Sequence, residues 1–145
     1  MLGDMTPKER FQAVMEGRIP DYVPVEPLMM SACTTVLNEG ASRYYFNSDI
    51  CAKAAMAAQE HYGYDCISMG ITSPIYGEIL GGSCTYPDDG YPMFETAAIQ
   101  EAADLDRMEP PDFINAPPPT FKRMIDGMKR VIDTVGDRVP VGALL

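Results

Sequence analysis

An uncharged run at residues 66–69 constrains the fold of this chain more than any other feature. It reads Cys-Ile-Ser-Met, and it lies between Gly63, which ends a helical pattern, and Gly70. A short, mostly apolar run of this kind is typical of a strand that is buried on both faces in a parallel sheet. We therefore expect an α/β fold built around this strand.

Polar residues follow that strand directly. Thr72 and Ser73 come first, and a helical stretch at residues 75–80 then carries the acid Glu78. Ligands of α/β folds bind at the carboxyl ends of the strands. The sequence therefore predicts that part of any binding site lies at residues 72–78.

Three longer helices are expected at residues 7–16, 48–62 and 121–135, and a glycine follows each of them. Thr6 and Glu9 form a capping box at the start of the first. The last has apolar residues at spacings of three and four, which predicts one buried face.

Two more strands and a hairpin complete the pattern. We expect strands at residues 22–26 and 139–145, and a hairpin at residues 82–94 around the turn Pro-Asp-Asp-Gly. Residues 109–119 contain five prolines and form a stiff connector. Strands that alternate with helices indicate βαβ units and a parallel sheet, here with an inserted β-hairpin.

The charge excludes some partners. The chain has 145 residues and a net charge of −10, with 21 acidic against 11 basic residues. Nucleic acids and anionic membranes require lysine and arginine, so we expect neither as a partner. The N-terminus has no apolar segment of a signal peptide, so the expected location is the cytoplasm.

The residues that commonly bind metals or act as bases show no local motif. The four cysteines are 18, 15 and 18 residues apart, and no Cys-x-x-Cys pair occurs. We interpret them as free, largely buried thiols rather than as a zinc site. His61, the only histidine, falls in the last turn of a helix and is interpreted as a helix-end residue rather than a catalytic base. We interpret Asp88 and Asp89 as part of a turn rather than as metal ligands.

Five stretches, taken in order, carry a resemblance to a known family. They are residues 5–11 (MTPKERF), 16–25 (EGRIPDYVPV), 62–65 (YGYD), 76–81 (YGEILG) and 135–141 (VGDRVPV). Their succession resembles the N-terminal part of the uroporphyrinogen decarboxylase superfamily. The resemblance implies a (β/α)8 barrel, of which residues 1–145 would be the N-terminal portion of a single domain. The family includes tetrapyrrole decarboxylases and methyltransferases that move a methyl group between a corrinoid protein and a thiol such as coenzyme M.

Two departures from the decarboxylases favour the methyltransferases. The decarboxylases have an Arg-Gln-Ala-Gly-Arg motif after the first strand, whereas residues 28–33 here read LMMSAC, and no basic residue lies between Arg18 and Arg43. The several carboxylates of a porphyrinogen would then lack cationic partners. The decarboxylases also have an aspartate after the second strand, and Thr72 occupies that position here.

The length also matters, because a (β/α)8 barrel takes about 250 residues. By the resemblance, the zinc ligands of such methyltransferases are a His-x-Cys pair and a distant Cys in the later half of the barrel. Zinc would hold the acceptor thiol as a thiolate, and a corrinoid would deliver the methyl group. We therefore expect zinc and a corrinoid in the complete enzyme, and no metal ligand or cofactor in these residues.

The candidate substrate-binding residues follow the first two expected strands. They are Glu26, Met29, Met30, Thr72, Ser73 and Glu78. Two of them have a structural alternative: Glu26 could pair with a cation on a neighbouring strand, and Glu78 could cap a turn. No catalytic residue can be assigned.

Two other functions stay open at this point. A tetrapyrrole decarboxylase could use cationic residues outside the usual motif. A catalytically inert segment could instead self-associate, because the unpaired edges of an open barrel invite pairing with another chain. Expected partners are therefore a corrinoid protein, a small-molecule substrate, or a second copy of the chain.

Overall fold

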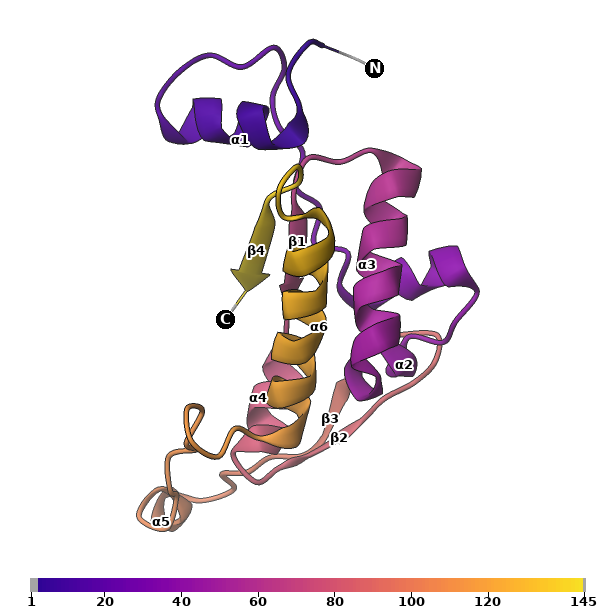
Figure 1. The fold of residues 1–145 in the computed structure, drawn as a ribbon. Coiled ribbons are helices and arrows are strands. Elements are labelled where there is room, and N and C mark those ends of the chain that lie inside the picture. Colours follow the sequence, from indigo (N-terminus) through magenta and orange to yellow (C-terminus); the bar gives the residue numbers. More distant parts are fainter. Residues whose placement is uncertain (1–2, 145) are drawn as a thin grey trace.

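The computed structural model describes residues 3–144 (Figure 1). Its elements, in order, are α1 (Pro7–Met15), the 3₁₀ helix η1 (Met30–Leu37), α2 (Ser42–Phe46), α3 (Ser48–Tyr62), β1 (Ile67–Gly70), α4 (Ser73–Ile79), β2 (Ser83–Thr85), β3 (Met93–Thr96), α5 (Ala102–Leu105), α6 (Pro119–Val135) and β4 (Val141–Leu144). The order of helices and strands agrees with the expected α/β class, but residues 3–144 close no barrel.

The parallel sheet is the pair β1–β4. Ile67 lies opposite Val141, and the register continues without a break to Gly70 opposite Leu144. The expected strands at 66–69 and 139–145 are thereby confirmed as a parallel pair, although Leu145 lies outside the described residues. Ile67 and Met69 are buried in the core, and Ser68, between them, faces the other side of the sheet.

Helices α3 and α6 pack against each other beside β1 (Figure 1). The Asn47 side chain accepts hydrogen bonds from the first turn of α3, and Gly63 ends the helix with φ at 70°. An alanine face on α3 and Gly127 on α6 allow close approach, because a Cβ at Gly127 would lie 3.2 Å from the Cys51 sulfur. The expected helices at 48–62 and 121–135 are confirmed, the second with two more residues at its start.

The expected strand at residues 22–26 is wrong. This stretch contains no β-strand, although the Val25 carbonyl accepts a hydrogen bond of 2.8 Å from the Asp65 amide. Pro24 and Pro27 have no N–H, so the stretch cannot form a regular ladder. It runs beside β1 and is called the β1-flanking segment (residues 22–28) below.

The predicted hairpin is confirmed as β2–β3. These strands are antiparallel, with Cys84 opposite Phe94 and an irregularity next to Ser83. The hairpin lies beyond the carboxyl end of β1 and extends from α4 toward α2 (Figure 1). All four cysteines are free, and only Cys84 is partly exposed. No helix within residues 3–144 is long and apolar enough to cross a membrane.

Candidate functional site

The sheet presents one polar position on the face turned away from its helices. Ser68 on β1 donates a hydrogen bond of 2.9 Å from its hydroxyl to Oε1 of Glu26 in the β1-flanking segment. Gly142 of β4 lies opposite Ser68, and a Cβ there would be 3.2 Å from the same carboxylate oxygen. The missing side chain of Gly142 thus leaves room for Glu26. The sequence predicted Glu26, but it did not predict Ser68, which donates a hydrogen bond to Glu26, or Gly142, which leaves space for it.

Cys66 lies on the same side of the sheet. Burial, together with the neighbouring Glu26 carboxylate, raises the pKa of the Cys66 thiol to about 12. The thiol is therefore protonated near neutral pH and is not a nucleophile. Within residues 3–144, no lysine or arginine forms an ion pair with Glu26, so the cation suggested as its alternative partner is not supplied by this part of the chain.

The two candidate methionines lie in different surroundings. Met30 is buried, and its φ of 46° is unusual for a residue with a side chain. Such a conformation costs about 1–3 kcal/mol and is held by its surroundings. Met29 instead lines a groove of about 410 Å³ with Val25, Tyr62 and Tyr64. Glu26 does not line this groove, so the structure places Met29 and Glu26 in different surroundings.

Thr72 and Ser73 lie between β1 and α4, as predicted. The Thr72 hydroxyl is buried, and it has no hydrogen-bond partner among the described residues. Thr72 occupies the N-cap position of α4, but its hydroxyl makes no capping hydrogen bond to the helix. Ser73 is exposed as the first residue of the helix. Buried hydroxyls normally form hydrogen bonds, so the Thr72 hydroxyl is available to bond a ligand.

Glu78 is engaged by the hairpin. The Tyr86 hydroxyl donates a hydrogen bond to the Glu78 carboxylate, and the Tyr86 ring packs against Phe46 with ring centres 4.7 Å apart. Burial, followed by the Glu78 hydrogen bond and charge, raises the pKa of Tyr86 well above its usual value. Glu78 thus joins α4 to the hairpin rather than capping a turn, and its contact with a substrate stays a prediction.

A buried charge cluster lies at the opposite end of β1, and sequence reasoning missed it. Arg10 and Asp65 are 2% and 1% exposed and form an ion pair. Arg10 also contacts both carboxylate oxygens of Asp21, at 2.6 and 3.0 Å, and its guanidinium lies 3.5 Å from the centre of the Tyr22 ring. The Arg10 hydrogen bond holds the pKa of Asp21 well below its usual range. The available signal was Asp65 itself, a charge directly before a buried strand, which has to be paired.

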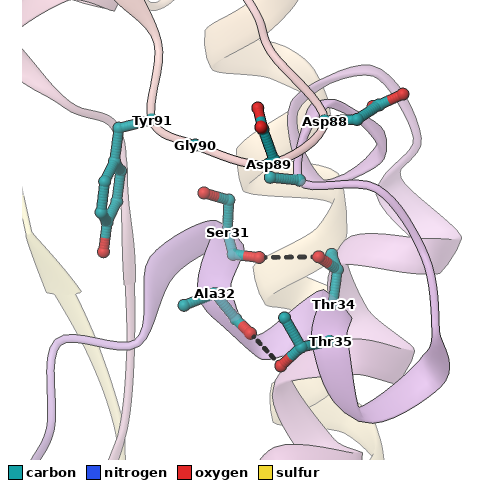
Figure 2. A pocket seen from close by; sticks show the side chains of 9 residues that line it. Ser31, Ala32, Thr34, Thr35, Asp88, Asp89, Gly90 and Tyr91 are labelled. Atoms are coloured by element: carbon teal, nitrogen blue, oxygen red, sulfur yellow. Dashed lines mark hydrogen bonds between the residues drawn. The ribbon is translucent and has the colours of Figure 1, made fainter.

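A pocket of about 240 Å³ lies between η1 and the hairpin turn (Figure 2). Figure 2 shows Thr34 and Thr35 on its wall, each donating its hydroxyl proton at 2.8 Å to a carbonyl of its own helix. Asp88 accepts a hydrogen bond from Ser42. None of the six candidate substrate-binding residues lines this pocket.

Comparison with known proteins shows the family. The family model Uroporphyrinogen decarboxylase (URO-D) matches residues 6–145. The chain belongs to the URO-D family. The resemblance predicted from the sequence is thereby confirmed.

One solved structure resembles this URO-D chain closely in fold. It is a methyltransferase from Methanosarcina mazei, 19% identical, with a TM-score of 0.67. The match covers 97% of this chain and 42% of that methyltransferase, so the URO-D chain described here spans less than half of its length. At that identity the match establishes a shared fold. No curated protein matches the sequence.

The residues of this URO-D chain do not fit a zinc site. Within residues 3–144, no three side chains of the types His, Cys, Asp and Glu come close enough together to hold a metal ion. Cys33, Cys51 and Cys66 are buried, and burial raises the pKa of each thiol to about 12, so that each keeps its proton at neutral pH.

Proposed function

We propose that this chain forms the N-terminal arc, residues 1–145, of the (β/α)8 barrel of a URO-D-family methyltransferase that moves a methyl group from a corrinoid to a thiol. One observation carries the choice of chemistry: the elements around the candidate site contain acids and no bases. Residues 19–42 and 54–106 contain no lysine or arginine. These ranges hold the β1-flanking segment, η1, α4 and the hairpin.

This charge pattern opposes a porphyrinogen substrate. A substrate with several carboxylates would meet the acids Glu26 and Glu78 without a cation from the same elements. Burying a carboxylate without a partner costs several kcal/mol. A thiol and a methyl group need no cationic partner, so the site suits methyl transfer better than tetrapyrrole decarboxylation.

The open edges of the sheet support the barrel arc. The β1-flanking segment exposes 81% of Val23 and 53% of Val25. β4 pairs with β1 on one side, and residues 3–144 provide no partner for its other edge. In a closed barrel both edges would pair with further strands, and the related methyltransferase has more than half of its length beyond the matched part.

In this proposal, residues 1–145 bind the substrate and form part of the barrel wall. Residues 3–144 contain no group of side chains that fits zinc, so we assign no zinc ligand and no step that involves zinc. Glu26, held by Ser68 and given room by Gly142, would present a carboxylate to the barrel interior. The buried Thr72 hydroxyl, which has no hydrogen-bond partner within residues 3–144, would offer a second polar contact where β1 ends.

The test is methyl transfer by the chain within its complete reading frame. We expect the zinc-loaded protein to transfer methyl from methylcobalamin to a thiol. Glu26→Gln should lower kcat/KM about tenfold, the effect of losing one hydrogen bond to a charged group. Glu95→Gln, on the exposed strand β3, is the matched control and should leave kcat/KM unchanged.

A folded, zinc-loaded protein without methyl transfer would contradict the proposal. A change in the Soret band of added coproporphyrin would show that the protein binds a tetrapyrrole. That result would favour the decarboxylase over the methyltransferase.

A further inference from the structure

We propose that Asp65 is a positioning residue: it fixes the β1-flanking segment beside β1 and so places Glu26 opposite Ser68. The structural part of this inference stands by itself. Only the value of Glu26 to a substrate rests on the proposed function.

Asp65 makes two hydrogen bonds to a single residue of the segment. Its backbone N–H donates to the Val25 carbonyl at 2.8 Å, and its carboxylate Oδ2 accepts from the Val25 N–H at 2.8 Å. The carboxylate therefore takes the place that a backbone carbonyl has in a β-ladder. Among the described residues, no other backbone hydrogen bond joins residues 22–28 to β1 or to Asp65.

The other oxygen of the Asp65 carboxylate, Oδ1, is held by two other residues. Oδ1 accepts from Arg10 Nη1 and, at 3.3 Å, from the Tyr22 hydroxyl. Arg10 is itself held by Asp21 and by the Met5 carbonyl, at 2.6 Å. Because Oδ1 is held by Arg10 and Tyr22, Oδ2 points toward the Val25 amide. The buried ion pair thus orients the carboxylate oxygen that accepts the Val25 hydrogen bond.

The position of Val25 determines that of Glu26. Successive residues of an extended chain face opposite sides, so fixing residue 25 sends residue 26 to the side of Ser68. A slip by one residue would move the chain by about 3.3 Å and turn Glu26 to the other side. The 2.9 Å bond between Ser68 and Glu26 could not survive such a shift.

A simpler role for Asp65 would be to neutralise Arg10, and a pair of variants separates the two roles. Asp21→Asn removes an acid from the same arginine and leaves the Val25 amide bond in place. Arg10 and Val25 bond to different oxygens of Asp65, and Asp65→Asn replaces one of these oxygens with an NH2 donor, so only one of the two partners keeps its acceptor. Val25→Pro removes the backbone N–H that donates to Asp65 Oδ2, and it leaves the Arg10–Asp65 ion pair in place.

The experiment is NMR on the 145-residue chain, with amide hydrogen exchange at Val25 and the side-chain resonances of Glu26 and Ser68 as readouts. In Asp65→Asn, we expect Val25 exchange to accelerate about tenfold relative to Ile67 and the Glu26 and Ser68 resonances to shift. Val25→Pro should shift the same two resonances. Asp21→Asn should leave Val25 exchange and both resonances close to those of the parent protein.

Equal effects of Asp65→Asn and Asp21→Asn would overturn the inference, as would unchanged Glu26 and Ser68 resonances in Val25→Pro. If Asp65→Asn does not fold, Val25→Pro decides alone. These readouts need no enzyme activity. A failed methyl-transfer assay would therefore reject the proposed function and leave the role of Asp65 standing.

Discussion

Arg10 carries a full charge although only 2% of the residue is exposed. It is tolerated there because Asp65, Asp21 and the Met5 carbonyl occupy its donors and the Tyr22 ring covers its face. Removing one member of a buried ion pair leaves the other charged and unpaired, which costs about 3–5 kcal/mol. The fold should therefore be more sensitive to the loss of one member of this cluster than to the loss of one member of a surface ion pair.

We expect Arg10→Ala to lower the free energy of unfolding by about 3–5 kcal/mol, because Asp65 loses its cationic partner. Urea unfolding followed by circular dichroism measures this change. The control is Arg18→Ala, since Arg18 pairs with Glu16 at the surface, where both side chains are about half exposed. The control should cost at most about 1 kcal/mol, and equal losses in both variants would contradict the burial argument.

Acid should destabilise the protein through Asp21. Arg10 lowers the pKa of Asp21 in the folded state, so the stabilisation is fully present above the ordinary value of about 3.9. It is lost as the pH falls below that value, because the unfolded chain then binds a proton that the folded chain resists. Urea midpoints should drop between pH 6 and pH 3, and Asp21→Asn should show a smaller drop. An identical drop in both proteins would contradict this assignment.

Among the elements, those with local signals could be predicted from the sequence. The capping box of Thr6 and Glu9 and the glycine after α3 lie within a few residues of the helix ends that they specify. The uncharged run before Gly70 likewise predicted a buried strand. Each of these signals depends on the conformational preference of one residue type, or on residues a few positions apart, so it can be read from the sequence directly.

Contacts between distant residues could not be predicted in this way. Arg10 and Asp65 are 55 positions apart, and the pairing of Tyr86 with Glu78 joins a hairpin to a helix. A strand was expected at residues 22–26, but Pro24 and Pro27 leave Val25 as the residue that pairs. Glu26 was predicted from its place at the carboxyl end of that stretch, whereas its partners Ser68 and Gly142 depend on the pairing of β1 with β4.

The pairing of β1 with β4 requires a residue without a side chain at position 70. A Cβ on Gly70 would lie 2.3 Å from the backbone oxygen of Leu144, which cannot move aside as a flexible side chain can. We expect Gly70→Ala to lower the free energy of unfolding by about 1–3 kcal/mol. Gly90→Ala is the control, because its nearest neighbour would be at an ordinary 3.4 Å. Equal unfolding midpoints for the two variants would contradict the observed close approach.

At the scale of the whole molecule, the apolar residues beside the open edge are the main feature. Between residues 19 and 28, four large apolar side chains are more than half exposed: Ile19, Val23, Val25 and Leu28. Unpaired edges and exposed apolar side chains favour pairing with another polypeptide. The family could be predicted from the order of short motifs along the sequence.

The 145-residue chain alone should therefore self-associate. Light scattering after size-exclusion chromatography should give a mass above that of a monomer, rising with protein concentration. Val23→Lys with Leu28→Lys, which places charges beside the open edge, should shift the mass toward the monomer. A monodisperse monomer over the whole concentration range would contradict an open edge.

The most direct test of an open parallel arc is an NMR measurement of cross-strand nuclear Overhauser effects in the isotope-labelled chain. We expect contacts in parallel register between Ile67 and Val141 and between Met69 and Ala143, together with contacts between Asp65 and Val25. Close Hα–Hα contacts of an antiparallel pair between these segments would contradict it.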